Sequence, residues 1–270
     1  MTNWFYAIPV WAVTILVVGG SLAIGLAASH GVQKVLRLKV NDEERDVAIN
    51  LMQVVAAYVG IMIAFAGVQV WQDYTDAKEA VSQEAATAAE LYQDLTIFGP
   101  ETAQARIALR NYVISIAHDE WPELAQGRGS EKTEASLHAV FNEIGKLDPT
   151  DNRANAIYSE MVGKVNELVN FRRARIENSQ EGVPAILWAI GIVGGLLTVA
   201  YASAFTPTRY NMFMTAGIAL TLGLLFLFIL TVNYPYKGEF SVSNRLLVHL
   251  PADFDRLDRT ALHGETTQLH

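Results

Sequence analysis

The charged side chains best placed to act on an ion occur in two groups, each next to a long apolar segment. An acidic group follows one such segment and a basic group precedes another: Asp73, Asp76 and Glu79; Arg172, Arg173 and Arg175. In a ring of subunits, carboxylates would concentrate cations and guanidinium groups would favour anions, so both groups are candidates for charge at a pore entrance. The alternative is a solvated acidic face and a basic cluster at lipid headgroups. The sign of any selectivity stays open.

Other chemistry has little support in the sequence. His118-Asp119-Glu120 is a tight cluster of possible metal ligands. Adjacent residues on a helix point in different directions, however, and no second His lies four residues after His118. The chain has no Cys, no phosphate-binding loop, no dinucleotide fingerprint and no nucleophile elbow. We therefore expect no cofactor and no bound metal, and an enzyme is the least favoured class of protein.

Composition indicates a membrane protein. The chain has 270 residues, of which 51% are hydrophobic, and a net charge of -8, which argues against a disordered chain and against a nucleic-acid partner. Four apolar blocks contain no Asp, Glu, Lys or Arg: Ile8–Ser29, Val47–Val70, Val183–Phe205 and Met212–Val232. Each is long enough to cross a hydrocarbon layer of about 30 Å, which takes about 20 residues.

The first block could instead be a cleaved signal peptide. No positive charge precedes it, however, and it is longer than the usual apolar core of such a peptide, about 7–15 residues. We therefore expect four transmembrane helices. They divide the chain into residues 1–70 with the first two crossings, a soluble domain at 71–182, residues 183–232 with the last two crossings, and a C-terminal tail at 233–270.

Four crossings leave the soluble domain on the same side as both termini. The loop after the first crossing is basic, and short basic loops stay in the cytoplasm: Lys34, Arg37, Lys39 and Arg45. This places the soluble domain outside the cytoplasm. The preference is weak, because the basic group at residues 172–175 and further Lys and Arg in the tail argue the other way.

The soluble domain is predicted to be all α. Phe98-Gly99-Pro100 is expected to end one helix and begin the next. The next helix runs from about Pro100 to Asp119 and ends at Trp121-Pro122. Ser130 is suited to cap a third helix, and Asp148-Pro149 marks the start of a fourth.

The second crossing has no proline between Val47 and Phe98, so it can continue as one helix of about 50 residues, or about 75 Å. Less than half of this length is needed to cross a membrane. The rest is expected to form a stalk that enters the soluble domain.

One stripe of this helix, taken at alternating steps of three and four, is small or weakly polar within the membrane: Asn50, Gln53, Ala57, Gly60, Ala64 and Gly67. The stripe continues to Leu95 with the period of a coiled-coil seam. It can be a packing face, because small residues let helices approach closely, or it can line an axial pore in a ring of subunits. Both interpretations predict a homo-oligomer unless the chain's own helices fill the seam.

Because no ionisable group lies in the membrane, coupled transport is disfavoured and passive conduction or a structural role remains.

Several short motifs, in this order, resemble the bestrophin-like domain proteins of bacteria: Glu84-Ala85, Glu120-Trp121-Pro122, Arg172 with Arg175, Pro184 with Trp188, and Tyr234-Pro235-Tyr236-Lys237-Gly238. The resemblance runs from about Val47 to Gly238. It implies a multi-pass protein of the bacterial plasma membrane that is similar to bestrophins, which are oligomeric, usually pentameric, anion channels with a cytoplasmic helical domain. This orientation opposes the one that the loop charges favour, and Ala57, Gly60 and Ala64 are smaller than the bulky apolar neck of bestrophins.

The leading hypothesis is a homo-oligomer of four or more subunits, five if bestrophin-like, that forms a passive ion pathway along the second helix. Its partners would be membrane lipids, inorganic ions and other copies of the chain. The alternative is a non-conducting sensor or scaffold whose helical domain binds a protein or lipid.

Overall fold

The computed structural model describes residues 3–6, 8–36, 42–203 and 208–267, and every regular element in these ranges is helical. The chain forms two compact units. The first comprises Met1–Tyr74 and Gly182–Ser241, and the second comprises Thr75–Glu181 and the chain from Val242 onward. The predicted all-α class is confirmed.

The first unit contains the membrane helices. Its elements are α1 (Asn3–Tyr6), α2 (Val10–Thr14), the π-helical turn η1 (Ile15–Gly19), α3 (Gly20–Leu36), the first part of α4 (Asp42–Phe98), α9 (Ala185–Ser203) and α10 (Arg209–Val232). Among the described residues, four helical stretches are long and apolar enough to cross a membrane. Each overlaps one of the four predicted blocks: Val10–Gly31, Asp46–Phe98, Asn152–Ala202 and Arg209–Val232. The first of them is the combined run α2–η1–α3, and the second and third extend well beyond the apolar blocks.

The core of the first unit lies where α4 meets α9 and α10. The residues buried on α4 recur every three or four positions and contact Val183, Ile229 and Val232; they are Val59, Ile63, Ala66 and Val70. A Cβ built on Gly194 would lie 2.3 Å from Cγ2 of Val59, so only glycine permits this approach of α9 to α4. Gly194 of the third crossing therefore lets these two helices pack closely.

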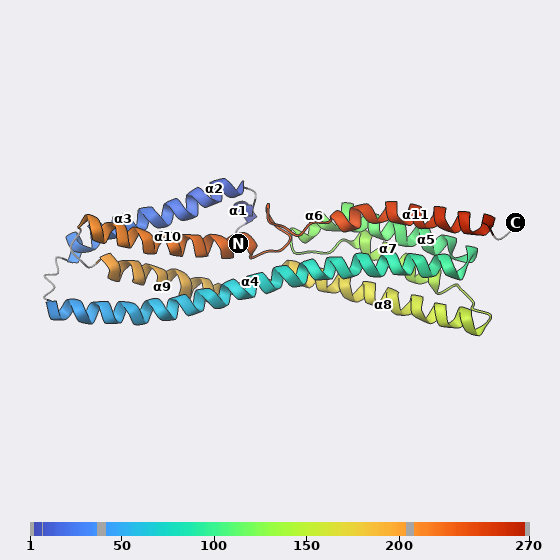
Figure 1. Cartoon of the computed structure of the whole chain (residues 1–270), viewed down its shortest axis with the longest axis horizontal. Helices are drawn as coiled ribbons and strands as arrows, with labels where there is room; N and C mark the ends of the chain where they lie inside the picture. The colour runs from blue at the N-terminus through green and yellow to red at the C-terminus, as the bar shows by residue number, and fades with distance from the viewer. Residues whose placement is uncertain (1–2, 7, 37–41, 204–207, 268–270) are drawn as a thin grey trace. The chain divides into compact units, whose positions relative to one another are not determined.

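Helix α4 is unbroken from Asp42 to Phe98 (Figure 1). Its 57 residues correspond to about 85 Å of helix at 1.5 Å per residue. The predicted continuation past the membrane is confirmed, and the helix ends where Gly99 takes a φ of 140° and Pro100 opens the next turn. Below, residues 47–70 are the membrane half of α4, and residues 75–98 are its distal half.

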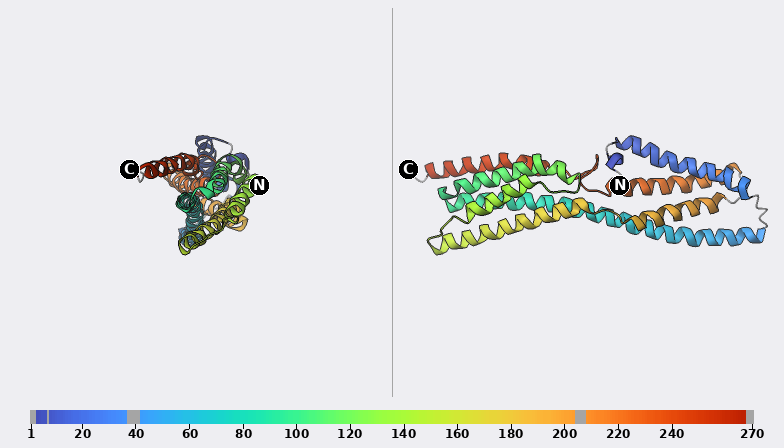
Figure 2. Two further views of the ribbon diagram at one scale, coloured as in Figure 1. Left: turned by 90° about the vertical axis from the view of Figure 1, so that its right-hand side faces the viewer. Right: turned by 180° about the vertical axis from the view of Figure 1, so that it is seen from behind.

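In the second unit, further helices pack along one side of the distal half of α4 (Figure 2). They are the 3₁₀ turn η2 (Pro100–Thr102), α5 (Ala103–Ser115), the π-helical turn η3 (Ile116–Glu120), α6 (Trp121–Leu124), α7 (Glu131–Ile144), α8 (Asn152–Gln180) and α11 (Arg245–Thr267).

The helix starts in this unit follow capping chemistry. Ser130 accepts a hydrogen bond from the backbone of Thr133, so its predicted role as a cap is confirmed. The cap of α8 is Asp151, whose side chain accepts from the N–H of Ala154 at 2.7 Å, so the start predicted at Asp148 was wrong by three residues. Pro122 lies in the first turn of α6, where its missing N–H costs nothing, and helical structure continues past it to Leu124.

The C-terminal segment was expected to be a separate tail, and the structure makes much of it a helix of the second unit. The ring of Phe254 on α11 stacks on Tyr92 of α4, with centroids 4.0 Å apart and planes 5° apart. The Tyr92 hydroxyl donates to Asp258 at 2.7 Å, and Arg106 of α5 pairs with the same carboxylate at 2.9 Å.

Candidate functional site

The membrane half of α4 has three faces. One is buried against α9 and α10, as described above. Of the six predicted pore-lining residues, Asn50, Gln53, Ala57, Gly60 and Ala64 are exposed in the single chain and Gly67 is half-buried. A Cβ on Gly60 would meet nothing within 4 Å, whereas one on Gly67 would touch Phe228 at 3.7 Å. We call this second face the small face.

The third face is bulky and apolar. Its members are between 52% and 70% exposed in the single chain: Val47, Leu51, Val54, Tyr58, Ile61, Phe65 and Val68. At 3.6 residues per turn this face lies beside the small face and away from the buried one. Such side chains require lipid or another protein surface around them.

The predicted seam continues along the distal half of α4, where other helices of the same chain cover it. Lys78 is exposed, whereas the predicted seam residues from Val81 onward are buried in the second unit: Val81, Ala85, Ala88, Tyr92 and Leu95. The seam is therefore closed by the chain's own helices beyond the membrane and open within it.

The three predicted acidic entrance residues do not share one environment. Asp73 is only 8% exposed and accepts a hydrogen bond from the side chain of Gln69 at 2.7 Å. Asp76 and Glu79 are exposed, and Glu79 accepts from Gln83 at 2.8 Å. A uniformly solvated acidic face is therefore not what the structure has.

The basic group differs even more from its expected surface position. Arg175 has no exposed surface, and its guanidinium bonds Glu84 of α4 through one nitrogen and Glu120 of η3 through the other. Both carboxylates are also fully buried. The hydroxyl of Tyr112, on α5, donates to the second oxygen of Glu84 at 2.5 Å. We call Glu84, Tyr112, Glu120 and Arg175 the buried cluster.

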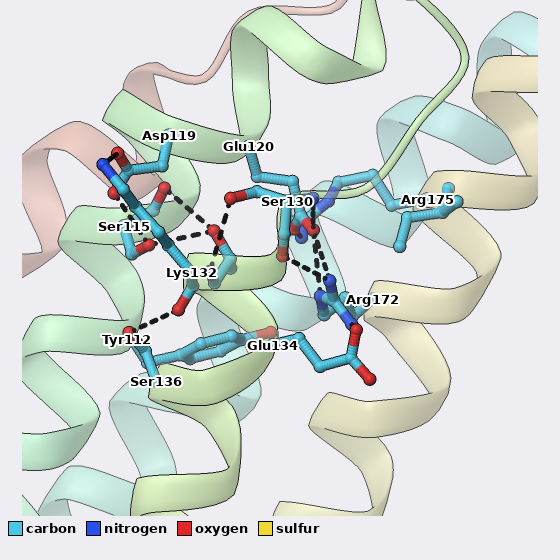
Figure 3. Close-up of polar contacts among 12 residues, drawn as sticks. Tyr112, Ser115, Asp119, Glu120, Ser130, Lys132, Glu134, Ser136, Arg172 and Arg175 are labelled. Carbon is cyan, nitrogen blue, oxygen red and sulfur yellow. Dashed lines mark hydrogen bonds and ion pairs between the residues drawn. The ribbon is translucent and has the colours of Figure 1, made fainter.

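Arg172 lies at the edge of this cluster (Figure 3). Its guanidinium contacts Oε1 of Glu120 at 2.7 Å and donates to the carbonyl of Ser130 at 3.1 Å, and its side chain is 12% exposed. The same Glu120 oxygen accepts the backbone N–H of Ser130 at 3.1 Å. Arg173 points away and is exposed. The three arginines therefore have different environments, and only Arg173 is at the surface, where a pore entrance or a headgroup cluster would require all three to be.

Burial controls the protonation of the cluster. Loss of water raises the pKa of the Glu84 carboxyl above its ordinary value; Arg175 and Tyr112 oppose this shift, and the nearby Glu120 adds to it. Burial, together with the adjacent Glu84 carboxylate, raises the pKa of Tyr112 well above its ordinary value, so Tyr112 remains a hydrogen-bond donor at physiological pH.

Sequence reasoning overlooked Glu84 as a functional position, although a signal was present. Glu84 occupies a core position in a heptad pattern whose other members are Ala77, Val81, Ala88, Leu91 and Leu95. A carboxylate in such a seam must find a cation or a proton. That rule predicts a buried partner, and Arg175 on α8 is that partner.

Fold and cluster together define a multi-pass helical membrane protein whose second long helix enters a separate helical unit held by buried ion pairs. The family model of the bestrophin-like domain matches residues 19–247, and the chain belongs to this family. No curated protein matches the chain.

Solved structures agree on the fold. A point mutant of a bacterial bestrophin homologue from Klebsiella pneumoniae is similar with a TM-score of 0.71 and 14% identity, over 91% of this chain and 98% of that one. A structure of the homologue from the same organism, solved by zinc phasing, has a TM-score of 0.69 and 14% identity, over 90% and 97% of the two chains. At such identity the likeness establishes the fold, not the activity.

Proposed function

We propose that several copies of the chain assemble around a common axis and form a passive ion pathway lined by the small face of α4, in the plasma membrane of a bacterial cell. The observation that carries this proposal is the open seam: five of its six membrane residues are exposed in the single chain. Membership of the bestrophin-like family supports a bestrophin-type channel. Four or more copies are needed to leave an axial opening, and five would match the bestrophins.

The distribution of residues on α4 favours this arrangement. The bulky face gives neighbouring copies or lipid an apolar surface, while the small face carries amides at Asn50 and Gln53 and little side-chain volume from Ala57 to Ala64. Small side chains and amide groups leave room for a hydrated ion without the cost of a buried charge. Because the four crossings contain no Asp, Glu, Lys, Arg or His, such a pathway would conduct passively.

A non-conducting sensor or scaffold is the second candidate. It is favoured by the same small side chains, since these let helices of two copies pack closely and close the axis. In that case the helical second unit would bind a protein or lipid partner.

Glycine substitutions in liposomes separate the two proposals. In a pathway lined by the small face, Gly60→Leu narrows the axis and lowers ion flux while the oligomer stays intact. In a packed seam, the same variant breaks the oligomer. The matched control is Gly217→Leu on α10, because a Cβ on either glycine meets nothing within 4 Å in the single chain. Wild-type protein that gives no flux over a range of salts, pH and voltage would sink the channel proposal.

A further inference from the structure

The buried cluster carries more acid than base in its driest part. Glu84, Glu120 and Arg175 are all fully buried, so two carboxylates share one guanidinium. A buried net charge is strongly unfavourable unless it is compensated. Arg172 compensates from a partly exposed position, but its ion pairs are with Glu120 and Glu134 rather than with Glu84. One proton on Glu84 would remove the excess negative charge.

We propose that the buried cluster is a proton-sensitive latch between α4 and α8, which is tightest when Glu84 holds a proton and loosens as the pH rises. In this step the Glu84 carboxylate accepts a proton from a hydronium ion, so one O–H bond forms on Glu84 and one O–H bond of the hydronium breaks to leave water. Arg175 keeps its ion pair with Glu120 throughout.

The direction follows from the groups that face Glu84. These are Tyr112 from α5, Glu120 from η3, and Arg172 and Arg175 from α8. Burial raises the pKa of Glu84 relative to a solvated glutamate. The packed conformation, in which the pKa of Glu84 is higher, binds a proton more readily than the open conformation. Low pH therefore favours the packed latch. That advantage is lost as the pH rises through the raised pKa.

A route for water leads to the edge of the cluster. A groove of about 600 Å³ lies between α7 and α8, and Arg172 forms part of its wall. On its other side Arg172 contacts Glu120, which in turn shares Arg175 with Glu84. Movement of this one arginine would bring water next to the carboxylates.

The latch also bears on the ion pathway. Glu84 is on the same unbroken helix that carries the small face, so a change in how α8 holds α4 provides a means for pH to regulate ion flux. This second step rests on the proposed function, whereas the latch itself does not.

Hydrogen–deuterium exchange on the full-length protein in detergent tests the latch directly. Backbone protection in residues 75–98 and in α8, corrected for the intrinsic pH dependence of exchange, is expected to fall between about pH 5 and about pH 9 in the wild type. Each pH unit by which the packed pKa of Glu84 exceeds the open one changes the opening equilibrium by up to about tenfold. Glu84→Gln cannot ionise and is expected to stay protected throughout.

Glu167→Gln is the matched control, since Glu167 is exposed on α8, and it is expected to follow the wild type. Tyr112→Phe provides a second variant in case Glu84→Gln does not fold. It removes a hydrogen bond that favours ionised Glu84, so the pH at which protection falls should move upward. Protection that does not depend on pH in the wild type, or a pH response that survives in Glu84→Gln, overturns the latch.

Ion flux from liposomes is measured on the same variants. If the wild type and Gly217→Leu conduct nothing while exchange behaves as expected, the channel proposal fails and the latch stands. If flux is present but exchange is independent of pH, the latch fails and the channel stands.

Discussion

Arg175 is held between carboxylates from two different elements, and this makes it the residue on which the second unit most depends. Its partners Glu84 and Glu120 are fully buried, so neither can turn to water if the guanidinium is removed. Removing one partner from a buried ion group is costly because the remaining charges keep their desolvation penalty without its compensation. Tyr112 can satisfy one oxygen of Glu84, but it brings no charge.

Arg175→Met tests this dependence. The change keeps an unbranched chain but removes the cation, and it is expected to lower the free energy of unfolding by about 3–5 kcal/mol. Thermal or denaturant unfolding of the purified protein in detergent gives the measurement. Arg173→Met is the control: the side chain is exposed two positions away, and the expected change is within about 0.5 kcal/mol. Equal stability of the two variants would contradict the role of Arg175.

At the scale of elements, the features that depend on neighbours in sequence were predicted well, and those that depend on distant contacts were predicted poorly. The stop at Gly99, the cap at Ser130 and the continuity of α4 all depend on neighbours in sequence. Helix α11 was not expected, because its place is decided by partners such as Tyr92 and Arg106, more than a hundred residues away. The start of α8 was misplaced because Asp148 and Asp151 are equally good caps by type, and only the folded chain chooses between them.

The helix end at Gly99 has a backbone conformation that side chains rarely adopt, with φ of 140° and ψ of -178°. Thr102 fixes this turn by donating to the carbonyls of Leu95 and Gly99 at 2.5 and 2.7 Å. Gly99→Ala should therefore destabilise the protein by about 1–3 kcal/mol, as measured by thermal unfolding. Gly163→Ala in α8 is the control with the opposite sign. It meets open space in a helix interior and should stabilise by up to about 1 kcal/mol. A neutral or stabilising Gly99→Ala would show that the turn relaxes freely.

At the scale of the whole molecule, the seam of α4 indicates which surface a single chain leaves exposed. The sequence predicted one stripe with one period, but it did not distinguish the half that the chain fills from the half that it leaves open. That distinction depends on α8 and α11 reaching the distal half, while no described residue covers Ala57 or Gly60 in the membrane half. Burial of such a surface requires lipid or further copies of the chain.

Cysteine cross-linking in membranes tests this difference between the two halves of the seam. The chain has no Cys, so Ala57→Cys and Ala88→Cys each introduce a single thiol on the same stripe of the same helix. Ala57 is exposed, whereas Ala88 is 1% exposed because its own chain covers it. Bifunctional thiol reagents should link Ala57→Cys into a covalent dimer, because each chain has one thiol and each thiol reacts once, and should leave Ala88→Cys monomeric.

The length of the reagent then distinguishes an open axis from a closed one. A direct disulfide needs Cα atoms within about 7 Å, so oxidation alone should link Ala57→Cys only if the small faces are packed together. Links that form only with long reagents fit thiols held apart around an ion pathway. Links that form by oxidation alone fit the scaffold instead, because the small faces are then in contact. No link with any reagent would mean that the small face meets lipid, and both proposals for α4 would then fail.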